Sequence, residues 1–352
     1  MSSATLSMSP LAATGSRLPV PAARGPLSEQ VLGTLTAGGP GSAVLPSAAG
    51  IDPTSDLVAD EDVQLMLFCL QELHYRGLEG VDDAWEWDVS AIALRRDLEG
   101  AFEAHLRGRV TVPDVVATTA DDVARVLFGM TASSGGPSLA RFVARKASLA
   151  QLREVLVHKS VYQLKEADPH TWAIPRLTGR AKAAAVEIQA DEYGGGRLAS
   201  MHSELFRGTL RALDLDDRYG AYVDVVPAVT LATSTFMSLA GLNRRLRGAI
   251  TGHLAAFEMT SSIPSRQYAD GMRRLGLGDD ATGYFDEHVE ADAVHEQIAG
   301  RDLAGGLVEA EPHLLGDVLF GAGACLLLDD LAAARHLAAF DAGTSSQREV
   351  AA

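Results

Sequence analysis

Two histidines and an aspartate, His288, Asp292 and His295, follow one another at intervals of four and three residues. An α-helix turns about 100° per residue, so these steps bring each side chain back to nearly the same direction. A helix over this stretch would therefore present imidazole, carboxylate and imidazole as one stripe. Neutral imidazole and carboxylate together suit iron, manganese or zinc, so the stripe predicts a metal-binding face.

Further acids and histidines lie upstream of this stripe. Glu166 precedes the residues ADPHTW, and Glu192 and His202 flank three consecutive glycines, Gly194 to Gly196. In an ideal helix, ten residues would set Glu192 and His202 about 80° apart. The glycines predict a break that lets both side chains reach one metal. Three carboxylates and three imidazoles on separate segments can hold two metal ions, with a bridging carboxylate and open positions for dioxygen.

This pattern resembles the haem-oxygenase-like diiron oxidases and oxygenases, a family of iron-containing redox enzymes. In that family one core helix supplies a Glu, and the next supplies a Glu followed ten residues later by a His. A third helix supplies His-xxx-Asp/Glu-xx-His. The matching residues here are Glu166, Glu192, His202, His288, Asp292 and His295. The segments PHTWAIPRL, EIQADEYGGG and GHLAAFEMTSSIP are also similar, and the resemblance spans about residues 57–340. It implies an all-α, haem-oxygenase-like helical bundle.

The resemblance also implies that these six residues bind two ferrous ions and that dioxygen is a co-substrate. A small amino-acid-like substrate would be oxidised in specialised metabolism, with electrons from an external reductant that the sequence does not identify. We expect amine N-oxygenation, because oxygen transfer to a nitrogen lone pair breaks no C–H bond. Oxidative C–C cleavage or desaturation of an amino or fatty acid is the alternative. A homodimer is expected, and manganese remains open as an alternative to iron.

Two other classes of helical metal protein are alternatives to this family. Ferritin-like diiron bundles repeat Glu-xx-His on two helices, but the sequence holds no Glu-xx-His, and Asp292-xx-His295 is its only acid-xx-His. That class is therefore disfavoured. A non-catalytic helical protein that binds metal or haem remains the alternative of another class.

Several other polar residues are candidates for substrate contacts. Glu258 could face the site as an extra carboxylate or as the counter-ion of a substrate amine. Arg266 could hold a substrate carboxylate by a bidentate contact. His170 and Trp172 follow Glu166 closely and could line the pocket. Glu154-xxx-His158 has chelating spacing but no further partner along the sequence, and we interpret it as a surface pair.

Composition limits the class of protein and its partners. The chain has a formal net charge of −16, which argues against a nucleic-acid partner because phosphate binding needs a basic face. No apolar run has the length of a membrane span. Cys69 and Cys325 lie in apolar runs, which predicts buried free thiols in a reducing cytoplasm.

Hydrophobic periodicity organises the chain as a series of helices. Residues 1–56 are rich in small residues, and we expect them to form a disordered arm. We expect one domain over residues 57–340 and a flexible tail over residues 341–352. Trp87 is among the expected core residues of the second helix. The expected helices are 58–75, 85–107, 121–130, 137–167, 180–192, 197–213, 217–248, 249–259, 284–300 and 313–340.

Overall fold

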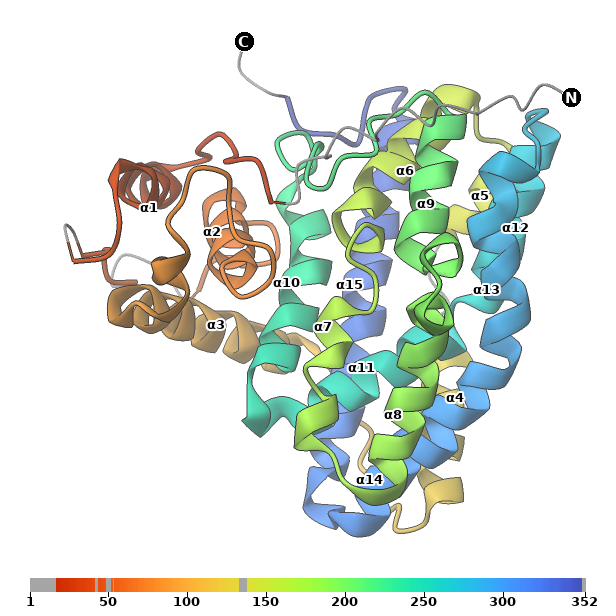
Figure 1. Cartoon of the computed structure of the whole chain (residues 1–352). Coiled ribbons are helices and arrows are strands. Elements are labelled where there is room, and N and C mark those ends of the chain that lie inside the picture. Colours follow the sequence, from red (N-terminus) through yellow and green to blue (C-terminus); the bar gives the residue numbers. More distant parts are fainter. Residues whose placement is uncertain (1–16, 42–43, 49–51, 53, 133–137, 350–352) are drawn as a thin grey trace, which may run out of the picture.

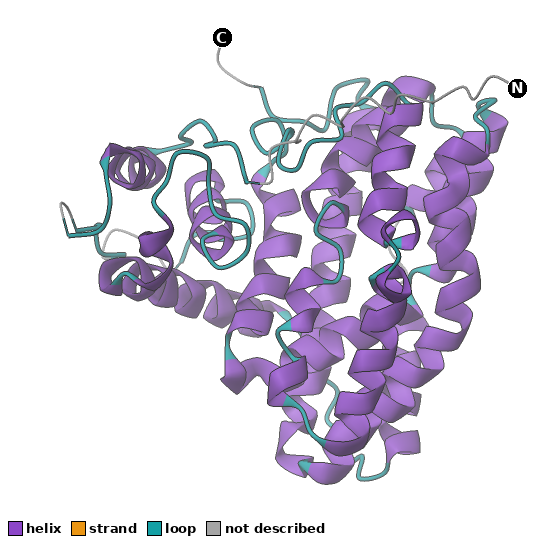
Figure 2. Ribbon diagram, in the orientation of Figure 1, coloured by secondary structure: helices purple, strands orange, loops and turns teal. Residues whose placement is uncertain are grey.

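The computed structural model describes residues 17–41, 44–48, 52, 54–132 and 138–349, without the side chains of residues 290–293. Helices make up most of this described part, and it contains no β-strand (Figure 2). The all-α helical bundle expected from the sequence is therefore confirmed.

Most of the later helices run lengthwise in one bundle, and α1, α2 and α3 form a smaller group at its side (Figure 1). A π-helical segment, Ile298–Gly305, continues α13. The α-helices are α1 (Pro26–Ala37), α2 (Glu61–Glu72), α3 (Val89–Arg109), α4 (Ala120–Ala132), α5 (Leu139–Arg145), α6 (Leu149–Gln163), α7 (Asp168–Thr171), α8 (Gly179–Glu192), α9 (His202–Ala212), α10 (Ala228–Leu242), α11 (Arg247–Met259), α12 (Ser262–Arg274), α13 (Asp279–Gln297), α14 (Gly306–Ala310) and α15 (Leu315–Asp341).

The helix expected over residues 137–167 is divided into α5 and α6. Ser148 begins α6, because its hydroxyl accepts the N–H of Gln151 while the Gln151 side chain accepts the N–H of Ser148. The helix then ends at Gln163. Glu166 therefore lies in the turn before α7, and not in the last turn of a helix as we expected.

Two further boundaries differ from the expected ones because of prolines. α10 begins at Ala228 and not at residue 217, since Pro227 occupies its N-cap position and the preceding residues form turns. No helix was expected over residues 262–274, which contain Pro264, but they form α12. A proline in the first turn of a helix costs no intrahelical hydrogen bond, so Pro264 is tolerated there.

The expectation of a disordered arm over residues 1–56 does not hold where α1 forms. Val31, Leu32 and Leu35 are buried, and α1 packs against α2. Asp62 of α2 accepts the backbone N–H groups of Leu27 and Ser28, which fixes the start of α1. The composition of residues 1–56 did not indicate this helix, because its apolar residues alternate with Gly, Ser and Thr. Residues 1–16 lie outside the described part of the chain.

The segment after α15 is likewise packed and not a free tail. Ser346 is buried, its carbonyl accepts the Nε–H of Arg335 at 3.0 Å, and the N–H of Arg348 bonds the Val225 carbonyl at 2.9 Å. The Arg335 side chain of α15 and the backbone of the turn before α10 therefore hold residues of the 342–348 segment, in contrast to the flexible tail expected from residue 341 onward.

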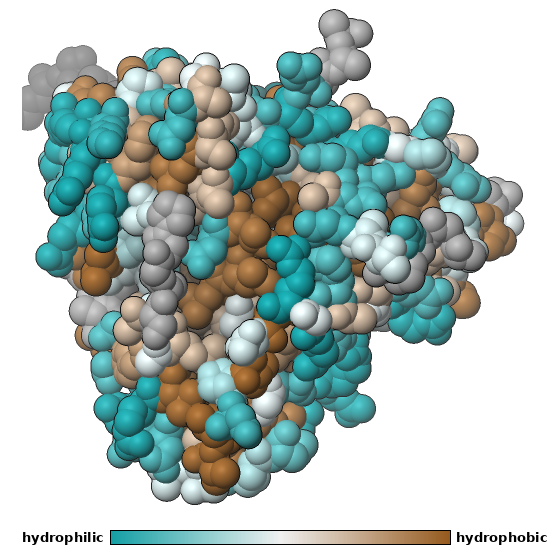
Figure 3. Space-filling view, turned by 180° about the vertical axis from the view of Figure 1, so that it is seen from behind, coloured by the Kyte–Doolittle hydropathy of each residue, from teal (hydrophilic) through white to brown (hydrophobic). Residues whose placement is uncertain are grey.

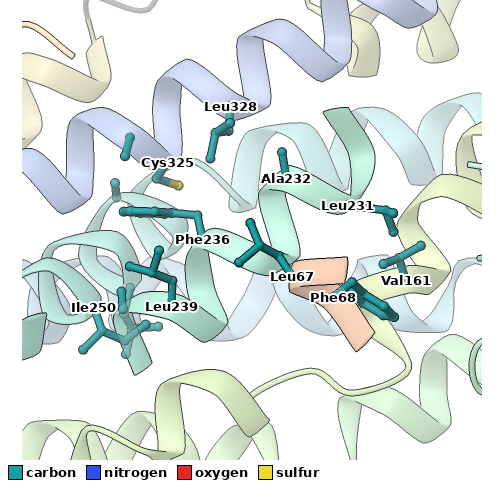
Figure 4. Packing of buried hydrophobic residues seen from close by; sticks show 14 of the residues in the cluster. Leu67, Phe68, Val161, Leu231, Ala232, Phe236, Leu239, Ile250, Cys325 and Leu328 are labelled. Atoms are coloured by element: carbon teal, nitrogen blue, oxygen red, sulfur yellow. The ribbon is translucent and has the colours of Figure 1, made fainter. Parts of the chain in front are cut away.

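The core of the bundle is formed where α10, α11 and α15 meet α2 and α6. Figure 4 shows Phe236 of α10 beside Cys325 of α15, with Leu239 of α10 and Leu67 of α2 near Phe236. Cys325 and Cys69 are free and buried, as predicted. Trp87, by contrast, is 71% exposed and does not join the core.

The rear face of the molecule gathers apolar residues in a central band between hydrophilic margins (Figure 3). None of the helices in the described ranges combines the length and apolar character needed to cross a bilayer.

The contact of α11 with α15 depends on glycines. A Cβ added at Gly252 would lie 1.8 Å from the Val318 carbonyl oxygen, and one at Gly321 would lie 1.9 Å from that of Ala249. We expect Gly252→Ala to lower the free energy of unfolding by about 1–3 kcal/mol or more, because the helices must move apart. Gly100→Ala is the control, since nothing lies near its added methyl group in α3. It should raise stability by about 0.5–1 kcal/mol. Urea unfolding of both variants checks this, and equal stability would contradict the close-packing argument.

Candidate metal centre

A glycine turn brings Glu192 and His202 together. Glu192 is the last residue of α8 and His202 the first of α9, and Glu192 Oε2 lies 3.0 Å from His202 Nδ1. Gly194, Gly195 and Gly196 all have positive φ. A Cβ on Gly194 would lie 2.4 Å from the carbonyl carbon of Ser200, so only glycine permits this reversal. The break predicted from the three glycines is therefore present, and it brings the side chains of Glu192 and His202 into contact.

Glu166 is held in the turn between α6 and α7. Its Oε1 accepts the hydroxyl of Tyr284 from α13 at 2.7 Å, and the side chain is buried. The next residue, Ala167, has φ of 73°, a strained conformation for a residue with a side chain. Gln189 of α8 stabilises it by donating to the Ala167 carbonyl at 2.9 Å. Strain stored beside a buried carboxylate is typical of functional sites.

His288 of α13 directs one ring nitrogen at Glu166. Its Nδ1 lies 2.7 Å from the Tyr284 carbonyl, which can only accept, so Nδ1 carries the hydrogen. The other ring nitrogen, Nε2, lies 3.7 Å from Glu166 Oε1. The His288 and His202 ring centroids are 4.4 Å apart. Fixing the tautomer through the far nitrogen is how proteins prepare a histidine for metal binding.

Glu258 and His295 form a second group around Glu192. Glu258, near the end of α11, places Oε2 3.4 Å from His295 Nδ1. His295 Nε2 lies 3.1 Å from Asp191 Oδ2. Potential ligand atoms of Glu192, Glu258 and His295 all lie within 4.8 Å of one another, and the same holds for Glu166, Glu192, His202 and His288. Glu192 is therefore common to two groups of buried residues that could bind a metal ion.

Asp292, the central residue of the predicted stripe, has its backbone in α13 between His288 and His295. Its side chain lies outside the described part of the structure, so its role as a ligand stays a prediction.

Burial and neighbouring charges shift the pKa values of these groups in opposite directions. Burial raises the pKa of Glu258. Burial also opposes ionisation of Glu166, but the neighbouring His288 prevails and holds the pKa of Glu166 below its usual value. Burial disfavours a charged His295, yet Glu258 and Asp191 raise its pKa to about 9. Acids and imidazoles thus share protons that bound cations would replace.

The donor set fits iron. Carboxylate oxygens and imidazole nitrogens are ligands that suit this metal. Glu166 Oε2 is buried and has no hydrogen-bond partner among the described side chains, which is costly for a carboxylate unless a cation is bound. Tyr284 and Asp191 orient Glu166 and His295 from behind, as residues around metal ligands do.

A cavity of about 800 Å³ reaches this centre, with Glu166 and His288 among its lining residues. Its walls carry apolar side chains, such as Phe257, together with Lys159 and Asp329. The Asp329 side chain is exposed to solvent. The surrounding protein nevertheless displaces enough water from its carboxyl group to raise the pKa to about 6. Burial likewise lowers the pKa of Lys159. Lys159 and Asp329 thus bring a positive and a negative charge to one cavity.

The other predicted substrate residues lie elsewhere. His170 is buried behind the cavity wall, with Nε2 3.1 Å from Nδ1 of His253. Trp172 is half-buried and packs its ring edge-on against Tyr75. Arg266 is exposed on α12 and is not among the cavity-lining residues. Glu258, by contrast, joins the ligand groups. An acid within the apolar segment HLAAFEM was the sequence signal for it, whereas nothing along the chain marked Lys159 and Asp329.

The raised pKa of His295 predicts that metal binding is linked to pH. With a pKa of about 9, His295 carries a proton at pH 7 in the metal-free protein, and a metal ion must displace it. We expect the affinity for ferrous iron to increase as pH rises toward 9, with proton release visible in anaerobic calorimetry as a dependence on buffer ionisation heat. Asp191→Asn is the informative variant, because it removes one carboxylate that raises this pKa and should move the dependence to lower pH. Identical heats in all buffers would contradict this linkage.

Comparison with known proteins agrees with the geometry. The sequence profile of the iron-containing redox enzymes matches residues 153–330, the part of the chain from α6 into α15. Nitrosourea synthase from Streptomyces achromogenes subsp. streptozoticus is 30% identical over 148 residues, which cover 42% of this chain and 31% of that protein. The chain thus matches about a third of the length of this relative. Since the profile covers half of the chain and includes most of the ligand groups described above, the chain belongs to the family of iron-containing redox enzymes.

Proposed function

We propose that the protein is a non-haem diiron oxygenase that uses dioxygen to oxidise a small amino-acid-like substrate. The observation that carries this proposal is the position of Glu192 in both groups of buried ligands. A carboxylate has two oxygen atoms and can bridge two cations, whereas one shared imidazole could not do so as readily. A site for a single metal ion would leave one of the two groups of buried acids and imidazoles without a bound cation.

Each residue has a place in this proposal. Glu166, His202 and His288 would hold one iron, Glu258 and His295 the other, and Glu192 would bridge them, with Asp292 as a further ligand. Two ferrous ions supply the electrons that activate dioxygen, and an external reductant must restore them. Tyr284 keeps Glu166 oriented by donating to its Oε1. Asp191 orients His295 by accepting a hydrogen bond from its Nε2.

The cavity supports an amino-acid-like substrate. No ion pair within 4.0 Å joins Lys159 to Asp329 in the described structure, although each affects the pKa of the other. Two opposite charges that face a cavity without a close contact can receive the carboxylate and ammonium groups of one zwitterion. Apolar lining residues such as Met237 and Phe257 would surround its aliphatic part.

Amine N-oxygenation is the reaction that we favour. The similar nitrosourea synthase is named for a product that carries oxidised nitrogen, and this supports the proposal. A substrate amine also offers a lone pair, so no C–H bond has to break first. The free, buried cysteines fit the reducing cytoplasm that we propose as the location.

Iron content tests the shared ligand directly. We expect about two iron ions per chain after anaerobic reconstitution of the wild type. Glu192→Ala should lose most of both and lower turnover about a hundredfold or more, because both groups depend on this carboxylate. Glu187→Ala removes an exposed acid from the same helix and should behave as wild type.

Metal analysis and Mössbauer spectroscopy make the measurement, and manganese loading tests the alternative metal. Full iron occupancy in Glu192→Ala would show that Glu192 is not a metal ligand. Haem absorbance without non-haem iron would favour the non-catalytic binding protein.

The products formed under ¹⁸O-labelled dioxygen distinguish the reaction types. We expect mass spectrometry to show label on nitrogen when the iron-loaded protein, a reductant and a panel of amino acids are combined. Asp329→Asn should raise KM for the accepted substrate about tenfold or more, since a charge-assisted hydrogen bond to the ammonium is lost. An alkene, an aldehyde or a shortened carbon skeleton without an N–O bond would instead establish C–C cleavage or desaturation.

A further inference from the structure

A separate cluster of potential ligands lies between α6, α15 and the segment that follows α15. Glu154 and His158 are one helical turn apart on α6, and His336 approaches them from α15. Ligand atoms of the three residues lie within 4.8 Å of one another. None of the three belongs to the groups around Glu192. We propose that they form a mononuclear site for a divalent transition metal, zinc in the first instance, with Ser346 supplying a fourth oxygen.

Ser346 is the point on which the cluster converges. Its Oγ lies 2.5 Å from Glu154 Oε1, 2.8 Å from His336 Nδ1 and 3.3 Å from His158 Nε2. The two imidazole centroids are 4.2 Å apart. Four donors from three segments therefore surround one small volume, and two nitrogens with a carboxylate form a common zinc set.

The histidines are prepared as neutral ligands. His158 and His336 are buried, and burial lowers the pKa of His158 to about 2 and that of His336 to about 4. Each imidazole therefore has a free lone pair at neutral pH, as metal binding requires. His158 Nδ1 lies 2.7 Å from the hydroxyl of Thr230, which orients the ring from its far side.

The sequence interpretation of Glu154 and His158 as a surface pair is corrected by these contacts. His158 is buried, and the missing partner is supplied by residues that lie far along the chain. In the metal-free arrangement Ser346 links all three side chains by hydrogen bonds. A divalent cation would take the place of these hydrogen bonds and bind the same four groups, which would join the segment after α15 to α6.

Charges nearby set the expected strength of the site. Glu154 is the one carboxylate of the set, and Arg335 and Lys159 lie close enough to lower the pKa of His336. These cations oppose metal binding, whereas Arg335 also holds the Ser346 carbonyl in place at 3.0 Å. Because one carboxylate must balance the metal charge, Glu154→Gln should weaken binding strongly while keeping the shape of the side chain.

The experiment uses the full-length, iron-loaded protein incubated with zinc and then desalted. We expect one zinc per chain in addition to the iron. His336→Ala and Glu154→Gln should lose the zinc, with affinity lowered about tenfold or more, and should retain the iron. His313→Ala removes an exposed histidine near the start of α15 and should bind zinc as the wild type does. Zinc should also raise Tm of the wild type, but not that of Glu154→Gln.

Cobalt substitution gives an independent readout of the same site. We expect cobalt to give the intense visible bands of a tetrahedral complex in the wild type, and Ser346→Ala to change their position or intensity because one ligand is replaced by water. Iron-loaded wild type that retains no zinc, or variants that retain as much zinc as wild type, would overturn this proposal. Iron content is measured in every sample, so loss of the diiron function is distinguished from loss of this site.

Discussion

The cost of burying carboxylates is the constraint on which this structure depends. Glu166, Glu192 and Glu258 are all buried, and no Lys or Arg ion pair within 4.0 Å reaches them in the described chain. Imidazoles take that place, and the pKa of His295, about 9, shows how strongly the acids retain its proton. Such an arrangement is stable only where cations or protons are shared. The helices around these three carboxylates must therefore hold acids and imidazoles within contact distance.

Backbone irregularities position half of the potential ligands, and regular helices position the others. Glu192 ends α8 and His202 begins α9, on either side of a left-handed glycine turn. Glu166 precedes Ala167 in another left-handed conformation. Only α13 presents its histidines in the regular helical manner. Continuous helices pack best as a bundle, whereas a centre shared by several of them needs breaks at which side chains can turn inward.

The residues around Glu192 and those around Ser346 differ in the direction in which histidine pKa values shift. Around Glu192, acids and imidazoles lie together, and the acids raise the pKa of His202 and His295 despite burial. Around Ser346, burial outweighs the single carboxylate and the pKa values of both histidines fall. His295 is therefore protonated at neutral pH in one region, whereas His158 and His336 are neutral in the other. The number of neighbouring carboxylates decides the outcome.

Local spacing was sufficient to predict part of this protein. The His288–His295 stripe, the glycine break and the all-α class follow from the period of a helix and the freedom of glycine, both of which are properties of neighbouring residues. The packing of α1, the turn that holds Glu166 and the arrival of Glu258 beside His295 were not predictable in this way. Nor was the meeting of Glu154 with His336 and Ser346. These contacts join residues far apart in the chain, and only the way in which helices pack decides which distant side chains share a buried space.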